Sequence, residues 1–262
     1  MRTSTLAVTE TASADLTNDA FLGGRLHVLQ PRKGFRSGID AVLLAAAVPA
    51  RSGDSVLDLG CGVGVAALCL HARVTALDLW GVEVQPTYAR LAGENAVANG
   101  AQMTVIAADL RALPAAFRQR QFSHVMMNPP YFDRATGPAA QDAGRDIALA
   151  GPTPLADWLD VGLRRLAPKG TLTVIQHITR LPEVLAAVEG RLGSLVVLPI
   201  AGRADSLPNL FIVQGRHGGK APFSLRKSLI LHDGEKHLAD ADSYTADVTA
   251  ILRDGATIRI GD

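Results

Sequence analysis

The segment SVLDLGCGVG, residues 55–64, decides the fold. Its first half is a short apolar run that is typical of a buried strand. Its second half places glycine at every second position, which lets the backbone turn tightly and approach a ligand closely. Residues 65–72 then have the composition of a helix. A strand, a glycine turn and a helix in this order predict the first unit of a parallel α/β sheet.

The same alternation continues along the chain. Apolar runs bounded by turn residues predict further strands, and apolar residues at helical spacing predict helices between them. The predicted strands are 79–84, 103–110, 124–128, 171–178, 195–200 and 209–215, and the predicted helices are 86–100, 155–166 and 181–190. Because parallel crossovers are right-handed, helices should cover both faces of the sheet. We predict an α/β fold with a doubly wound, seven-stranded, mostly parallel, Rossmann-like sheet.

Around this sheet the chain divides into four segments. Residues 1–20 are polar and are expected to be a disordered tail. Residues 21–54 form a basic lead-in with a short helix, where Asp40 either caps the helix or faces a bound cofactor. Residues 55–219 are the expected cofactor-binding catalytic domain. Residues 220–262 are expected to pack on the same domain as a C-terminal extension.

Composition excludes several classes of protein. The net charge of +1 means that nucleic-acid binding would need local basic patches. The two cysteines, Cys61 and Cys69, are too few for a disulfide framework or a four-thiolate metal site. HDGEKH, residues 232–237, is interpreted as a polar hairpin turn, and no metal is expected. Without a signal peptide or a spanning apolar run, we expect a soluble, cytoplasmic protein that does not bind membranes.

Three acids at the ends of successive strands point to the cofactor. Glu83 follows the glycine loop by about 20 residues, the position at which an acid binds two ribose hydroxyls. Asp109 can accept a hydrogen bond from an adenine amine, and Leu110 can pack on the ring. Asp58 precedes the first glycine, where a carboxylate repels phosphate and suits a cation. The loop is also G-x-G-x-G, so S-adenosylmethionine is favoured over NAD.

NPPY, residues 128–131, ends the fourth predicted strand beside the glycine loop. The lone pair of a planar amine, such as that of adenine, is delocalised, and two hydrogen-bond acceptors can tilt the nitrogen so that this pair points at a methyl carbon. Asn128 offers a side-chain oxygen and Pro129 a backbone carbonyl, which Pro130 holds in place. Tyr131 offers a ring on which a base can stack, worth about 1–3 kcal/mol. We predict that these four residues are catalytic.

VLDLGCGVG, GVE, AADL and NPPY, in this order, resemble the motifs of class I S-adenosylmethionine-dependent methyltransferases that act on amino groups. The lead-in LQPRKGFRSGIDAVLLAA and the tail ILRDGATI make the chain similar to the bacterial tRNA1(Val) (adenine(37)-N6)-methyltransferases, which modify the adenosine 3′ of the anticodon. The resemblance implies cofactor contacts at Asp58, Gly60, Gly62, Glu83 and Asp109, and catalysis at residues 128–131. With their neighbours, the predicted cofactor-binding residues are Asp58, Gly60, Cys61, Gly62, Glu83, Val84, Asp109, Leu110 and Asn128. Cys61 is interpreted as a small filler and not as a nucleophile.

A tRNA substrate requires phosphate contacts. The RNA-binding candidates are two acid-free basic groups and one residue of the loop after the motif: Arg25, Arg32, Lys33 and Arg36; Arg216, Lys220, Arg226 and Lys227; and Arg134. Each basic group could equally be a solvated surface.

Other substrates remain open from the motifs. A release-factor glutamine and the guanine N2 of rRNA present the same delocalised nitrogen. About 50 residues precede the first strand, fewer than the helical substrate domain of glutamine methyltransferases needs. A non-catalytic RNA- or cofactor-binding module is the alternative outside enzymes, and intact Asn128 and Glu83 count against it. The oligomeric state is not predicted.

Overall fold

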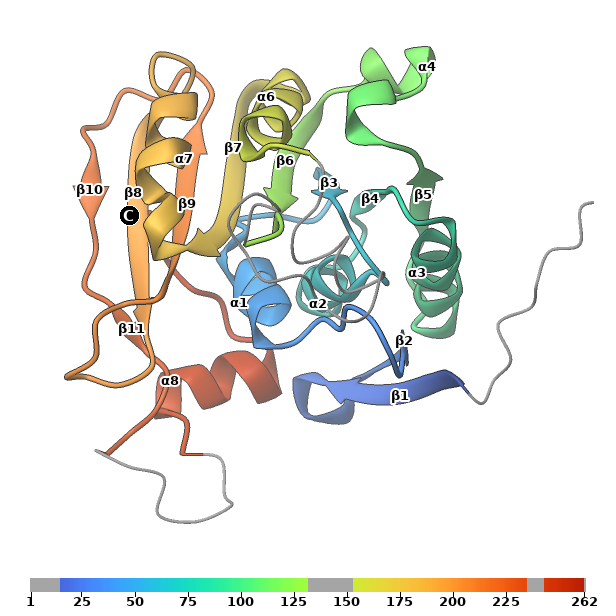
Figure 1. The fold of residues 1–262 in the computed structure, drawn as a ribbon, viewed down its shortest axis with the longest axis horizontal. Helices are drawn as coiled ribbons and strands as arrows, with labels where there is room; N and C mark the ends of the chain where they lie inside the picture. Colours follow the sequence, from blue (N-terminus) through green and yellow to red (C-terminus); the bar gives the residue numbers. More distant parts are fainter. Residues whose placement is uncertain (1–14, 132–152, 235–242, 262) are drawn as a thin grey trace, which may run out of the picture.

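The computed structural model describes residues 15–131, 153–234 and 243–261. Its centre is a nine-stranded sheet with the order β10-β8-β9-β7-β6-β3-β4-β5, to which β11 is added through β8 (Figure 1). The larger strands are β3 Ser55–Leu59, β4 Asp78–Glu83, β5 Met103–Ala107, β6 Phe122–Met127, β7 Leu166–His177, β8 Gly193–Ala201 and β9 Leu210–Arg216. These seven correspond to the predicted strands. The two-residue strands β10 Ser224–Leu225 and β11 Leu229–Ile230 were too short to predict.

The predicted doubly wound, mostly parallel arrangement is confirmed. β3 lies between β4 and β6, and the strands from β5 to β7 are all parallel, whereas β9 is antiparallel to both β7 and β8. The order therefore reverses at β3, and ligands of such sheets bind beyond the carboxyl ends of the strands at this point.

Helices cover both faces of the sheet (Figure 1). They are α1 Ile39–Ala47, α2 Val65–Arg73 and α3 Pro86–Ala98 on one face, and α4 Ala115–Arg118, α6 Leu155–Arg164 and α7 Leu181–Val188 on the other. Successive strand residues point to opposite faces. Thus Val56 joins the core under α1–α3, whereas Leu57 joins the core under α6 and α7.

Two boundaries differ from the sequence prediction. The helix predicted over 155–166 and the strand predicted over 171–178 have other bounds: α6 ends at Arg164, and β7 already begins at Leu166, so residues 168–170 lie within the strand. The reason is that Leu166 pairs with Phe122 ahead of a register irregularity, so that the turn residues lie within the strand.

The lead-in forms an antiparallel pair of strands, β1 Leu16–Phe21 and β2 Leu26–Pro31, joined by the short 3₁₀ helix η2 Leu22–Gly24. The predicted disorder of residues 1–20 is therefore wrong for residues 15–20, and residues 1–14 lie outside the described residues. Pairing with β2 orders this strand, whose central residues are polar. The buried Asn95 amide on α3 then holds β2, because it bonds both the N–H and the carbonyl of Leu29, at 2.8 and 3.0 Å.

The described part of the C-terminal segment packs on the same sheet. β10 and β11 pair with β8, and α8 Ala246–Thr249 continues into η5 Ala250–Asp254. Ile258 donates its N–H to the Ala46 carbonyl at 2.9 Å and contributes to the core under α1. His232 and Tyr244 form an antiparallel bridge around the predicted turn, of which residues 235–242 lie outside the described residues. No helix in the described ranges is long and apolar enough to span a membrane.

Candidate active site

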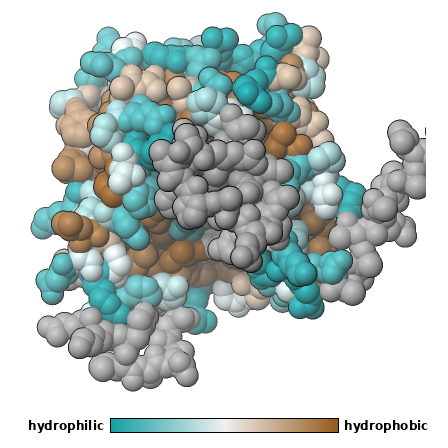
Figure 2. Space-filling view, in the orientation of Figure 1, coloured by the Kyte–Doolittle hydropathy of each residue, from teal (hydrophilic) through white to brown (hydrophobic). Residues whose placement is uncertain are grey.

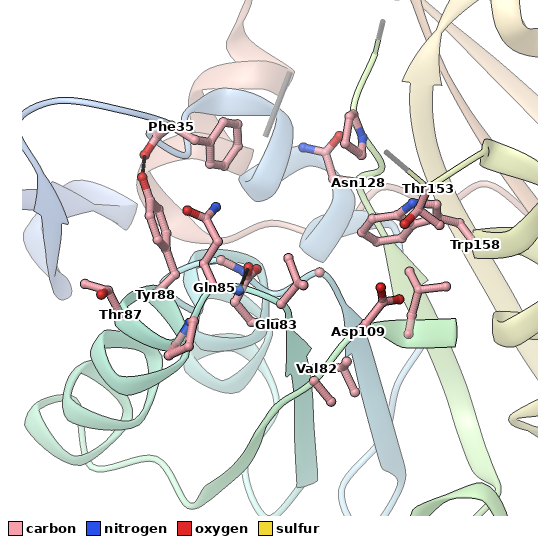
Figure 3. Close-up of a pocket in the computed structure, with 17 residues that line it drawn as sticks. Phe35, Val82, Glu83, Gln85, Thr87, Tyr88, Asp109, Asn128, Thr153 and Trp158 are labelled. Carbon is pink, nitrogen blue, oxygen red and sulfur yellow. Dashed lines mark hydrogen bonds between the residues drawn. The ribbon is translucent and has the colours of Figure 1, made fainter. Parts of the chain in front are cut away.

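A cavity of about 610 Å³ opens beyond the carboxyl ends of β3, β4 and β6, where the strand order reverses (Figure 3). Most of the predicted site residues contribute to its wall: Gly60, Gly62, Glu83, Val84, Asp109, Leu110, Asn128 and Pro130. The motifs that the sequence separates by about 70 residues thus meet in one cavity. Figure 2 shows the molecule in space-filling form in the orientation of Figure 1.

The glycine loop and Glu83 form one hydrogen-bonded unit. Gly60 and Gly62 both have positive φ, 70° and 55°, which other residues rarely adopt. The Glu83 carboxylate accepts from the N–H of Gly62 at 3.0 Å and from the N–H of Gln85 at 2.8 Å. Burial raises the pKa of Glu83, and these backbone donors oppose the rise. Each carboxylate oxygen keeps a further lone pair for a hydroxyl donor.

Asp58 and Cys61 are not among the residues that line the cavity. Asp58 is 3% exposed, and its Oδ2 has no hydrogen-bond partner among the described residues. Burial raises the pKa of Asp58 to about 7, the Ala67 N–H opposes the rise, and the charge of Glu83 adds to it. Burial likewise raises the pKa of Cys61, whose sulfur would lie 2.6 Å from a Cβ placed on Gly81. A packed, protonated thiol supports the interpretation of Cys61 as a filler.

Asp109 caps the 3₁₀ turn η3 Leu110–Ala112, where its side chain accepts from the N–H of Arg111 at 2.8 Å. It also forms an ion pair with the Arg111 guanidinium at 2.7 Å. The hydrogen bond from the Arg111 side chain lowers the pKa of Asp109, so this acid is charged. Leu110 is buried beneath it. Asp109 and Leu110 thus offer a carboxylate acceptor next to an apolar side chain.

The Asn-Pro-Pro-Tyr segment follows β6 directly. Asn128 lines the cavity, and its side-chain Oδ1 is buried without a hydrogen-bond partner among the described residues. The Pro129 carbonyl accepts from the side-chain amide of Gln176 at 3.2 Å, and the Pro130 carbonyl is 3.4 Å from the same nitrogen. Gln176 is fully buried near the end of β7. It fixes the carbonyls of the motif, and the sequence pattern showed it only as a strand residue.

Tyr131 is held both by its ring and by its hydroxyl, and its stacking role stays a prediction. Its ring packs against the core under α1, outside the cavity wall, and its hydroxyl donates to the Asp40 carboxylate at 2.5 Å. Burial and the charge of Asp40 raise the pKa of Tyr131, so that the hydroxyl stays protonated. Asp40 is not the cap of α1, which is Gly38. Of the two roles considered for Asp40, capping is therefore wrong.

Three aromatic side chains of the wall were missed as site residues. Phe35 lies over Gly62, and its carbonyl accepts from the Tyr88 hydroxyl at 3.1 Å. Trp158, on α6, lies against Gly60. All three line the cavity. Tyr88 and Trp158 occur on the apolar faces of their helices, so periodicity alone marks them as core residues.

The structure separates the two basic groups. Arg32, Lys33 and Arg36 are exposed in the segment that contains Phe35, the residue of this segment that lines the cavity, and Arg36 forms an ion pair with Asp19 at 2.6 Å. Arg25 lies elsewhere, against the backbone at Leu22 and Gly255.

The second basic group lies at the side of the sheet that β9, β8 and β10 form. Arg216, the last residue of β9, pairs with Thr171 of β7, which is level with His124 and so lies towards the end of the sheet opposite to Asn128. Arg226 donates to the carbonyl of Ile260, and Lys220 and Lys227 are exposed near the outer edge formed by β8 and β10. Arg134 lies outside the described residues.

Comparison with known proteins agrees with this geometry. The family model of the methyltransferase small domain matches residues 37–188, more than half of the chain. The chain belongs to this methyltransferase family. Its matched region contains the glycine loop, the three acids and the Asn-Pro-Pro-Tyr segment.

Relatives and solved structures extend the similarity. A tRNA1(Val) (adenine(37)-N6)-methyltransferase of Dickeya chrysanthemi is 28% identical over 248 residues, 91% of this methyltransferase and 94% of that protein. One of Aeromonas hydrophila is 31% identical over 172 residues, 64% and 70% of the two chains. A predicted O-methyltransferase from Agrobacterium tumefaciens has the same fold, with a TM-score of 0.67, 24% identity, and coverage of 84% and 98%.

Proposed function

We propose that this methyltransferase transfers a methyl group from S-adenosylmethionine to the exocyclic N6 of adenine 37 in tRNA1(Val), in the cytoplasm. The observation that carries the proposal is the buried Oδ1 of Asn128, a cavity residue beside the glycine loop, which has no hydrogen-bond partner among the residues that the structure describes. A buried acceptor without a donor is costly unless a ligand supplies one. The relative from Dickeya chrysanthemi, similar over nearly the whole length, is named for this adenine, which supports the choice of base.

The cavity fits S-adenosylmethionine. Glu83 presents carboxylate oxygens to two ribose hydroxyls, while Asp109 and Leu110 suit the amine and the ring face of its adenine. Positive φ at Gly60 and Gly62 disfavours other residues, and a Cβ on Gly60 would also lie 2.4 Å from Cη2 of Trp158 in the cavity wall. When bound, the cofactor supplies an electrophilic methyl group on a sulfonium.

The chain's own residues prepare the nucleophile. The Asn128 Oδ1 and the second lone pair of the Pro129 carbonyl accept the two N6–H groups, and Gln176 keeps this carbonyl in place. The lone pair of N6 is thereby turned out of the base plane. The N6–C bond forms as the S–C bond breaks, and one N6 proton is then released to solvent. Fixed acceptors of this kind favour the positive charge that develops on N6.

A flipped base also needs the anticodon backbone near the cavity mouth. Lys33 and Arg32, beside Phe35, are placed to neutralise phosphates there. An anticodon loop presents unstacked bases, so little energy is needed to extrude one.

The test is the destination of the label. Purified protein and methyl-labelled cofactor are incubated in separate reactions with bulk tRNA, with rRNA and with a release factor. The proposal predicts label in N6-methyladenosine of tRNA. Label in rRNA N2-methylguanine or in release-factor glutamine would replace the proposed substrate, and no transfer to any of them would favour a non-catalytic module.

A further inference from the structure

Trp158, a residue of the cavity wall, carries a second buried polar atom. Its indole Nε1 is buried and has no hydrogen-bond partner in the described part of the chain, as is true of the Asn128 Oδ1. Both side chains line the same cavity. One of these atoms is an obligatory donor and the other an acceptor. Two buried, unsatisfied and complementary atoms in one wall indicate a ligand that carries both a donor and an acceptor.

The orientation of the indole assigns its N–H to one side of the cavity. A Cβ on Gly60 would lie 2.4 Å from Cη2 and 2.6 Å from Cζ3 of Trp158. These carbons belong to the edge of the six-membered ring that is remote from Nε1. The indole therefore presents hydrocarbon to the glycine loop, and its N–H faces away from the loop. Figure 3 shows the ring between Asn128 and Asp109, beside Thr153.

We propose that Trp158 determines specificity for the target base, by donating its N–H to a ring nitrogen next to the amine that Asn128 holds. This inference rests on the proposed function. In adenine the exocyclic amine lies between N1 and N7, and both are acceptors. A donor beside the Asn128 acceptor therefore matches either side of N6. A site that is built to hydrogen-bond a group discriminates strongly against analogues that lack it.

The test combines a protein variant with a base analogue. The substrates are tRNAs that carry adenosine, 1-deazaadenosine or 7-deazaadenosine at the target position, and single-turnover rates are measured at saturating cofactor. Trp158→Phe keeps an aromatic ring and removes the N–H. Trp80→Phe is the matched control, because Trp80 donates its N–H to Asp78 at 2.8 Å and is not part of the cavity wall.

The wild type should lose about 10-fold in rate with one of the two deaza analogues, the one that lacks the bonded nitrogen. Trp158→Phe should be slowed about 10-fold with adenosine and should show no further loss with that analogue, while its affinity for the cofactor is unchanged. An equal penalty in the wild type and in Trp158→Phe, or no penalty with either analogue, would overturn the role of Trp158. Failure of the wild type to methylate adenosine itself would instead overturn the proposed function.

Discussion

The Tyr131 hydroxyl donates to the Asp40 carboxylate at 2.5 Å and so joins the end of the Asn-Pro-Pro-Tyr segment to the first turn of α1. The two residues are 91 positions apart in the chain. Tyr131 packs against the core, and its backbone directly follows Pro130 in the cavity wall. The contact therefore fixes the end of the Asn-Pro-Pro-Tyr segment outside the cavity wall.

Removal of this anchor should slow transfer without affecting cofactor binding. Asp40→Ala is expected to lower kcat about 10-fold, because a charge-assisted hydrogen bond is lost. Asp40→Asn retains an acceptor for the hydroxyl and should restore most of the rate. The measurement is kcat for tRNA, alongside the Kd of the cofactor. Equal rates for Asp40→Ala and the wild type would show that the anchor has no part in turnover.

Gln176 should matter for the rate in a similar way. Gln176→Met keeps the volume but removes the donor to the Pro129 carbonyl, so we expect a loss of about 10-fold in kcat at unchanged cofactor affinity. Gln214→Met is the matched control, because its amide donates to the Ala47 carbonyl at 2.9 Å, away from the cavity. Thermal unfolding of both variants separates a loss of positioning from a loss of stability. If both variants turn over alike, Gln176 has no positioning role.

Asp58 should make the stability of the cofactor-free protein depend on pH. Its pKa is raised from 3.8 to about 7 in the folded state, so the folded protein binds this proton more tightly than the unfolded chain. The contribution to stability is present at low pH and is lost as the pH rises from about 4 through about 7. Between about pH 5 and about pH 8, the Tm of Asp58→Asn should therefore fall less than that of the wild type. Parallel curves of Tm against pH would contradict the shifted pKa.

The two basic groups should contribute unequally to tRNA binding. Lys33 lies two residues before Phe35 in the lead-in. Lys33→Glu should therefore raise KM for tRNA severalfold, most clearly at low salt. Lys227→Glu makes the same charge change on the outer edge of the sheet and should leave KM nearly unchanged. A comparison of KM at two salt concentrations checks both. A larger effect at Lys227 would place the tRNA on the other side of the sheet.

Much of the fold could be predicted because its signals are local. The apolar runs, the glycine loop and the end of the predicted helix at residues 99–100 each follow from nearby residues, and the helices on both faces follow from the handedness of crossovers. The strand over Leu16–Phe21 could not be found in this way. Its central residues Thr17–Asp19 are polar, and pairing with β2 together with the packing of Leu16 and Phe21 orders it.

The candidate site was predictable to the same extent. Asn128, Glu83 and Asp109 stand at strand ends within recognisable motifs. Gln176 and Trp158 have no such motif, since their roles arise from contacts with residues far away in the chain. The hydrogen bond from Tyr131 to Asp40 also has no signal in the sequence, and the stacking role that the motif predicts for the ring stays a prediction.

The central claim is that the Asn128 carboxamide holds the amine while the methyl group is transferred. Nucleoside analysis of tRNA incubated with the wild type and with Asn128→Ala tests it most directly, together with the Kd of the cofactor for both proteins. The account predicts N6-methyladenosine with the wild type, and for Asn128→Ala a rate at least about 100-fold lower at nearly unchanged cofactor affinity. Equal yields of N6-methyladenosine from both proteins would contradict it.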